Sequence, residues 1–177
     1  RTAYKKKVKM MTFDNEPELY KIAKYCPGAK VLIRIKVANI GSIVELSLKF
    51  GADPEQSISL LKKARSMGLK PMGLSFHVGS QCTNVENYLQ ALEVASAIFN
   101  EAKPSGLFLN ILDIGGGFPI KHFEKDSHLT FERMASQIRK KLKRLFDKNV
   151  KFIAEPGRFM VGPSGILVTQ VIGRTFR

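Results

Sequence analysis

Three consecutive glycines, Gly115, Gly116 and Gly117, constrain this 177-residue chain more than any other feature. They follow the apolar run 109–114, which predicts a buried strand. Backbone without side chains at a strand end allows successive N–H groups to close around an anion such as a phosphate. A tight turn is the alternative interpretation, since glycine also suits turns. Because three glycines occur together, we favour an anion cradle.

Two further polar clusters follow predicted strands. Residues 77–80 (HVGS) come after the run 72–76, and residues 155–158 (EPGR) come after the run 152–154. With the glycines they offer an aromatic ring, a hydroxyl, a carboxylate and a guanidinium. This inventory suits a flat, phosphorylated, nitrogen-containing cofactor.

The composition predicts one soluble globular domain. Apolar residues make up 44% of the chain and charged residues 25%. No apolar run approaches the roughly 20 residues that cross a bilayer, so no membrane association is expected. With only Cys26 and Cys82, no disulfide framework is indicated, and a cytoplasmic location is the default.

The formal charge of +14 allows two interpretations. A basic surface can bind nucleic acid, but no aromatic residues alternate with the basic runs as a base-stacking surface requires. The runs at 62–65 and 139–144 lie on the polar faces of predicted helices. We therefore favour a solvated basic exterior and expect no nucleic-acid partner.

Strand-like and helix-like segments alternate along the chain. Asn15 and Glu18 predict one capping box, and Thr83 and Glu86 predict another. The expected strands are 10–13, 31–35, 72–76, 109–114, 152–154 and 166–172, and the expected helices are 15–26, a short one between Ser42 and Gly51, 57–67, 83–102 and 131–146.

This alternation predicts an α/β fold with a parallel sheet, either an open doubly wound sheet or a (β/α) barrel. The sequence GGGFP differs from the Gly-x-Gly-x-x-Gly of dinucleotide-binding folds, which favours the barrel. A complete barrel needs eight units and about 250 residues. Five strand–helix units therefore indicate a partial TIM-type barrel, the later part of a larger one.

Several polar residues carry alternative interpretations. Arg158 suits two phosphate oxygens, or else a surface ion pair. Glu155 suits a protonated pyridine nitrogen, or else Arg34 within its apolar strand. His77 can stack on a ring, or be an ordinary core histidine. Ser80 can donate to a phosphate.

The remaining reactive side chains carry no predicted chemistry. Cys82 is expected only to line the site. His122 and His128 are read as surface residues, and no metal site is predicted.

Five motifs together resemble one family. Residues 76–80, 112–119 and 154–158 are similar to barrel motifs of the alanine-racemase-like decarboxylases that depend on pyridoxal 5'-phosphate. Residues 10–14 and 48–52 resemble the ornithine and lysine/ornithine decarboxylase branch. The resemblance implies a cytoplasmic homodimer that acts on a small amino acid in polyamine biosynthesis.

The same resemblance implies roles for individual residues. His77 would stack on the pyridoxal ring, Glu155 would pair with its nitrogen, and Arg34 would lie beside the pocket. Lys49 would lie near a dimer interface. The phosphate would be held by Ser80, Gly115, Gly116, Gly117 and Arg158.

The chain also departs from the family. No Schiff-base lysine or proton donor of the family is matched, and Lys36 is rejected as a substitute because it follows the strand of Arg34. We expect residues 1–165 to be the C-terminal portion of the barrel and 166–177 to begin a β-rich domain. The implied reaction is decarboxylation of ornithine or lysine to a diamine, with the fragment alone inactive. The alternatives are a non-catalytic, antizyme-inhibitor-like regulator or a diaminopimelate, arginine or carboxynorspermidine decarboxylase.

Overall fold

The computed structural model describes residues 1–38, 40, 42, 49–120 and 131–175. Five strands form one sheet in the order β1-β2-β3-β4-β5, and every neighbouring pair is parallel. The strands are β1 (Met10–Phe13), β2 (Lys30–Arg34), β3 (Lys70–Ser75), β4 (Ile111–Asp113) and β5 (Lys151–Ile153).

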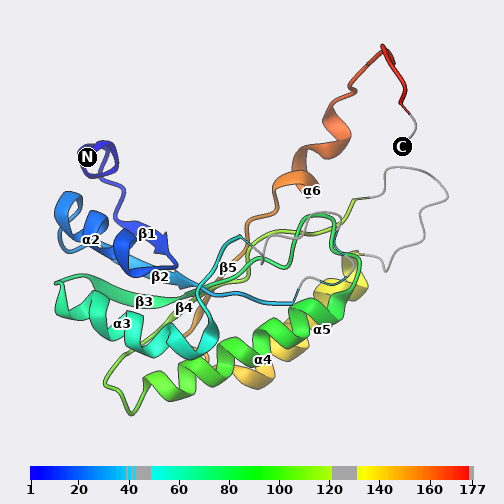
Figure 1. The fold of residues 1–177 in the computed structure, drawn as a ribbon. Coiled ribbons are helices and arrows are strands. Elements are labelled where there is room, and N and C mark those ends of the chain that lie inside the picture. The colour runs from blue at the N-terminus through cyan, green and yellow to red at the C-terminus, as the bar shows by residue number, and fades with distance from the viewer. Residues whose placement is uncertain (39, 41, 43–48, 121–130, 176–177) are drawn as a thin grey trace.

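Four helices cover one face of this sheet, with α3, α4 and α5 side by side beneath the strands in Figure 1. The helices of the described residues are α1 (Thr2–Lys5), α2 (Glu16–Tyr25), α3 (Ser57–Ser66), α4 (Val85–Ala102), α5 (Phe131–Leu145) and α6 (Gly157–Val161), with short 3-10 turns η1 (Pro54–Gln56) and η2 (Gly162–Ser164).

Alternate strand residues build the core between sheet and helices. Val31, Ile33, Leu74 and Leu112 point into it and are all 0% exposed, because side chains two apart lie on the same face of a strand. Each of α2 to α5 adds apolar residues to this cluster: Leu19 and Ile22, Leu61 and Ala64, Leu92 and Ala95, Met134 and Ile138.

This arrangement confirms the partial barrel. The strand order follows the chain order without reversal, and the helices that join the core lie on one face. A doubly wound sheet would reverse its strand order at a switch point and carry helices on both faces. The opposite face, which would line a barrel, carries Thr12, Leu32 and Asp113.

The predicted helix starts were right for α2 and one residue early for α4. Asn15 caps α2, and its side chain accepts from the N–H of Glu18 at 2.9 Å. The cap of α4 is Asn84, whose Oδ1 accepts from the N–H of Glu86 at 3.1 Å. The Thr83 capping box was therefore wrong, because Asn84 is an equally good cap and stands closer to the first turn.

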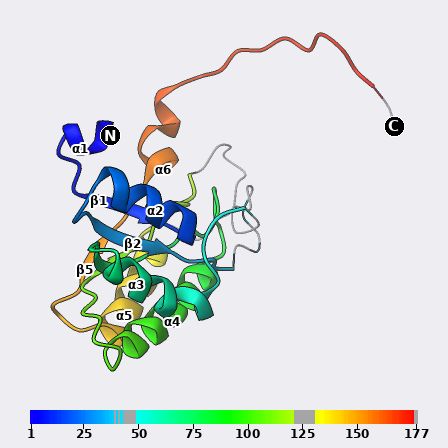
Figure 2. The ribbon, with the colours of Figure 1, turned by 60° about the vertical axis from the view of Figure 1, so that its left-hand side comes forward.

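The predicted strand 166–172 was also wrong. Residues 165–175 have no secondary structure, and Figure 2 shows this segment running away from the barrel. Ile166 is 93% exposed and Ile172 is 98% exposed. β-branched residues favour a strand only where a neighbouring strand accepts their backbone hydrogen bonds, and this segment has none among the described residues.

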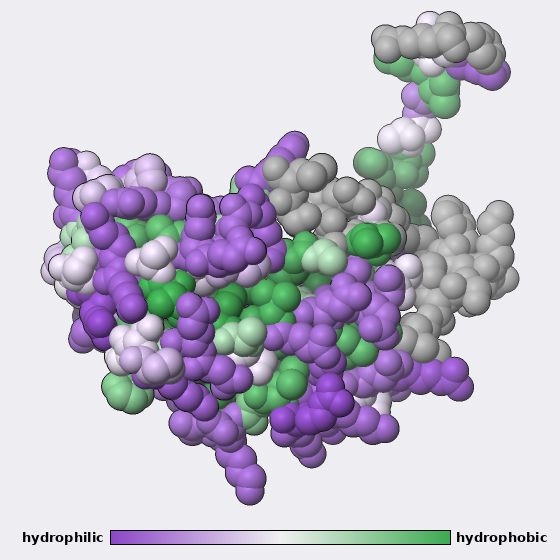
Figure 3. Space-filling model, turned by 60° about the horizontal axis from the view of Figure 1, so that its bottom comes forward, coloured by the Kyte–Doolittle hydropathy of each residue, from purple (hydrophilic) through white to green (hydrophobic). Residues whose placement is uncertain are grey.

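Polar side chains cover most of the helical face seen in Figure 3, interrupted by hydrophobic patches. Some of its lysines pair with acids, as Lys63 does with Glu16 at 3.0 Å and Lys141 with Glu93. No helix in the described ranges is both long enough and apolar enough to cross a membrane. The expected helix after Ser42, and both His122 and His128, lie outside the described residues.

Candidate functional site

Three loops meet at the carboxyl edge of the sheet, after β3, β4 and β5. A Cβ built on Gly116 would lie 2.4 Å from the carbonyl oxygen of Glu155 and 3.4 Å from Nε2 of His77. The middle glycine is therefore packed between the predicted carboxylate residue and the predicted imidazole. The structure brings one residue of each sequence cluster to one place.

The flanking glycines are required by backbone geometry. Gly115 has φ +65°, and a Cβ there would lie 2.1 Å from the carbonyl oxygen of Phe76. Gly117 has φ +102°, and its Cβ would lie 2.3 Å from the carbonyl oxygen of Gly79. Side chains at these positions would collide with neighbouring protein backbone, a constraint that acts even without an anion.

Backbone hydrogen bonds hold the glycine loop to its neighbours. Gly115 N–H donates to Oδ1 of Asp113 at 2.9 Å, and Gly115 C=O accepts from the N–H of Glu155 at 2.8 Å. Gly117 C=O accepts from the N–H of Cys82 at 2.8 Å. The N–H groups of Gly116 and Gly117 find no acceptor within the described ranges.

The imidazole of His77 is held as a neutral ring. Its Nδ1 accepts from the N–H of Gly79 at 3.0 Å, which requires that Nδ1 carry no proton. Burial, and then the positive charge of Arg34, lower the pKa of His77, while Asp113 opposes them. A neutral, fixed ring is suited to lie flat against a planar ligand.

Two carboxylates lie on the inner face of the sheet. Glu155 and Asp113, with Thr12, Leu32 and Ile153, line an open hollow of about 590 Å³ that continues past β1 to α2. Burial raises the pKa of Asp113, and the nearby charge of Glu155 raises it further, although the bond from Gly115 opposes both. Glu155 itself is exposed to the hollow.

Arg34 is not the partner of Glu155. Among the described residues Glu155 forms no ion pair, and the guanidinium of Arg34 lies over the ring of Phe50 at 5.3 Å. The carboxylate of Glu155 thus stays available to a cation in the hollow, while Arg34 acts on the site through its charge on His77 and Asp113.

Ser80 and Arg158 follow strands that end at the same carboxyl edge of the sheet, but they are less enclosed than the glycine loop. Ser80 is half-buried in the β3 loop, next to Gln81, whose side chain exchanges two hydrogen bonds of 2.9 Å with the backbone of Ile120. Arg158 lies exposed in α6, and a Cβ built on Gly162 would meet both Ile120 and the Cγ of Arg158. The contacts from Gln81 to Ile120 and from Ile120 to Gly162 therefore connect the loop after β3 to the segment after β5.

Of the other reactive residues, Cys82 adjoins the glycine loop through its backbone N–H, whereas Lys36 and Lys49 make no bond to that loop among the described residues. Nζ of Lys36 pairs with Oδ1 of Asp53 at 2.9 Å, and Lys49 is exposed in a turn. The buried thiol of Cys82 donates to the carbonyl oxygen of Asn84 at 3.3 Å. No described residue gives this thiol a base.

Sequence reasoning missed two residues that support the glycine loop. Tyr88 donates from its hydroxyl to Gly116 C=O at 2.9 Å, and Asp113 accepts from Gly115 N–H. A carboxyl at the end of an apolar strand is a usable signal for Asp113. Tyr88 gives no such signal, because it falls in the apolar stripe of α4 and reads as core.

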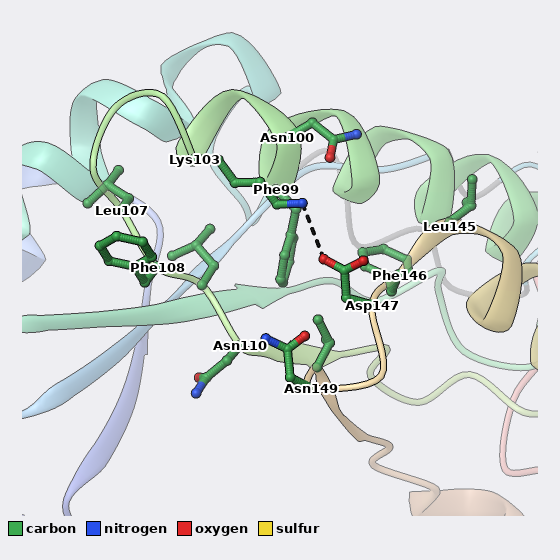
Figure 4. Close-up of a pocket in the computed structure, with 12 residues that line it drawn as sticks. Phe99, Asn100, Lys103, Leu107, Phe108, Asn110, Leu145, Phe146, Asp147 and Asn149 are labelled. Carbon is green, nitrogen blue, oxygen red and sulfur yellow. Dashed lines mark hydrogen bonds and ion pairs between the residues drawn. The ribbon is translucent and has the colours of Figure 1, made fainter.

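A second hollow lies at the opposite, amino-terminal edge of β4 and β5 (Figure 4). Its volume is about 280 Å³, and aromatic side chains of Phe99, Phe108 and Phe146 line it. Lys103 pairs with Asp147 across it at 3.2 Å. None of the predicted site residues lies in this hollow.

The family model "Pyridoxal-dependent decarboxylase, pyridoxal binding domain" matches residues 1–162. The chain belongs to this decarboxylase family. Its membership confirms the resemblance read from the motifs and agrees with the expected pyridoxal phosphate cofactor.

Curated relatives place the domain within the family. Identity is 45% over 170 residues to lysine/ornithine decarboxylase of Selenomonas ruminantium, 41% over 169 residues to ornithine decarboxylase of Mus musculus, and 40% over 174 residues to antizyme inhibitor 2 of Xenopus laevis. These matches cover 96%, 94% and 97% of this chain but only 43%, 36% and 38% of the relatives. The chain therefore spans less than half the length of these relatives.

Solved structures agree with the fold. A mutant of SrLDC in complex with PLP matches with TM-score 0.85 and 44% identity, over 89% of this chain and 41% of that chain. SrLDC in complex with PLP and cadaverine matches with TM-score 0.80 and 42% identity, over 89% and 39%. The arginine decarboxylase of Paramecium bursaria Chlorella virus matches with TM-score 0.80 and 36% identity, over 89% and 42%.

The site fits a pyridoxal phosphate. Gly116 is a buried residue whose N–H has no acceptor among the described residues, and buried N–H groups without a partner are rare in folded proteins. A phosphate oxygen would satisfy it together with Gly117 N–H. The imidazole of His77 and the backbone of Glu155 lie beside the same loop, and Glu155 also lines the hollow. A ring and a carboxyl so placed would suit the pyridine of the cofactor.

Proposed function

We propose that the intact protein decarboxylates a basic amino acid, ornithine or lysine, to a diamine, and that this chain holds the cofactor. The close packing of Gly116 against the backbone of Glu155 and the imidazole of His77 carries the proposal, because the three predicted clusters meet there. Complexes of similar proteins with PLP and cadaverine support the cofactor and the kind of product. The diamine would belong to polyamine biosynthesis.

Each of the predicted site residues would have a defined part in this reaction. The N–H groups of Gly116 and Gly117, with Ser80 and Arg158, would bind the phosphate, since charged and backbone donors together make strong phosphate sites. His77 would lie against the ring, and Glu155 would hold a proton on the ring nitrogen. When bound, the cofactor supplies an electron sink for the electron pair left by departing CO₂.

The domain division and the oligomeric state are part of the same proposal. Residues 1–165 would complete a barrel with segments outside this chain, and residues 166–177 would enter a β-rich domain. The exposed apolar side chains of residues 166–172 support this, because a further domain would bury them. A homodimer in the cytoplasm would supply the remaining active-site residues.

A regulator without activity is the second candidate function, favoured by the 40% identity to antizyme inhibitor 2. An assay of the full-length protein with pyridoxal phosphate separates the two. We expect CO₂ release from L-ornithine or L-lysine, with the corresponding diamine as product. Cofactor binding without release of CO₂ from ornithine, lysine, arginine or diaminopimelate would instead favour the regulator.

A further inference from the structure

Within the described part of the chain, two N–H groups of the glycine loop have no acceptor, and the hydrogen bonds of their own peptide units aim them. In a trans peptide the C=O and N–H point in opposite directions across one plane, and no cis peptide occurs in the described residues. Gly115 C=O accepts from Glu155 N–H, which fixes the plane that carries Gly116 N–H. Gly116 C=O accepts from the hydroxyl of Tyr88, which fixes the plane that carries Gly117 N–H.

Tyr88 is the side-chain member of this pair. Its ring is fully buried in α4 and stacks on Phe118, with centroids 5.3 Å apart and an angle of 14° between the planes. A Cβ on Gly117 would lie 3.3 Å from the hydroxyl oxygen, so the tyrosine also fills the space behind that residue. Burial raises the pKa of Tyr88, so the phenol stays protonated and remains a donor.

We propose that Tyr88 is a positioning residue for the phosphate of the cofactor, acting through the peptide between Gly116 and Gly117. Tyr88 does not touch the phosphate. Its hydroxyl holds Gly116 C=O towards α4, so that Gly117 N–H points the other way, into the cradle. Without that bond the glycine peptide is free to rotate, because glycine has few steric restraints. This inference rests on the proposed function and adds a residue to it.

The test compares two ligands that differ only in the phosphate. Full-length apoprotein is titrated with pyridoxal 5'-phosphate and with pyridoxal, and absorbance gives a dissociation constant for each. For Tyr88→Phe we expect the constant for pyridoxal phosphate to rise about fivefold to tenfold, the usual effect of one lost hydrogen bond. The constant for pyridoxal should change by less than about twofold, because the ring contacts are unaltered.

A hydroxyl on the same helix provides the control. Ser96 lies in α4 and its Oγ donates to Leu145 C=O at 3.3 Å, on the side of the helix that faces α5. Ser96→Ala should leave both dissociation constants unchanged. The ratio of the two constants does not depend on how much of a preparation is folded, so a loss of stability in Tyr88→Phe does not obscure the result.

The outcomes separate a failure of the role of Tyr88 from a failure of the proposed function. If the wild type prefers the phosphorylated ligand and Tyr88→Phe keeps the full preference, the role of Tyr88 is wrong and the cofactor site stands. An equal loss of affinity for both ligands also overturns the role, since it indicates general damage. If the wild type shows no preference for pyridoxal phosphate over pyridoxal, the phosphate site and the inference fail together.

Discussion

The N–H of Gly79 donates to Nδ1 of His77 at 3.0 Å, across a tight turn that follows β3. This bond exists only while Nδ1 is unprotonated, so it stabilises the neutral ring. Burial and the charge of Arg34 act in the same direction and lower the pKa of His77. The result is a flat, uncharged ring at the mouth of the site.

We therefore expect His77 to titrate below the ordinary 6.5 in full-length apoprotein. Because the folded state binds fewer protons than the unfolded state between that lowered pKa and 6.5, stability rises with pH through this window. The contribution of His77 to the free energy of unfolding decreases as the pH falls from 6.5 to the lowered pKa. ¹H NMR of the ring protons gives the midpoint, assigned by the signal absent from His77→Asn. A midpoint at or above 6.5 would contradict the neutral ring.

The glycine loop predicts a large difference between two Gly→Ala substitutions. Gly115→Ala places a Cβ 2.1 Å from Phe76 C=O at φ +65°, whereas a Cβ on Gly157 meets no atom within 4 Å. We expect Gly115→Ala to lower the free energy of unfolding by more than about 2 kcal/mol, and Gly157→Ala to change it by less than about 0.5 kcal/mol. Urea unfolding of the apoprotein measures both. Equal effects would mean that the loop relaxes around the methyl group.

Sequence reasoning reached the barrel through local signals. Apolar runs gave the five strands, and Asn15 gave one helix start to the residue, because both depend on neighbours in sequence. The strand at 166–172 failed because strand formation needs a partner, which no local pattern reveals. The short helix α6, which contains Arg158, was not predicted either, since only five residues form it.

In the candidate site, too, features that depend on neighbours in sequence were predictable, and features that depend on distant residues were not. The clusters around His77, Gly116 and Glu155 were readable because each follows a strand, and parallel strands end at one edge. Tyr88 was not readable, because its role depends on a hydroxyl reaching a carbonyl 28 residues later in the chain. The reason for glycine at 115 and 117 was also incomplete. Neighbouring backbone excludes a Cβ there independently of any anion.

Because Arg158 is exposed and is proposed to contact only the phosphate, we expect its substitution to change cofactor affinity alone. Loss of a charge-assisted bond to phosphate costs about 1.5–3 kcal/mol, so Arg158→Ala should weaken binding of pyridoxal phosphate by about tenfold to a hundredfold. At saturating cofactor the turnover number should recover most of its wild-type value. Arg139→Ala, an exposed arginine of α5, is the control for lost positive charge. Unaltered affinity in Arg158→Ala would remove this residue from the phosphate site.

Glu155 should show the opposite behaviour. Its carboxylate lines the hollow without an ion pair among the described residues, which leaves it free to keep a ring nitrogen protonated. We expect Glu155→Ala to lower kcat on the order of 100-fold, the scale of a lost electrostatic contact to developing charge. Cofactor affinity should fall by less than about tenfold, because the phosphate contacts remain. Steady-state kinetics at saturating substrate and cofactor measure the first effect, and absorbance titration measures the second. Glu101→Ala, an exposed acid of α4, controls for lost negative charge. A Glu155→Ala protein with wild-type kcat would show that the carboxylate does not hold the ring proton, even if the cofactor binds where we propose.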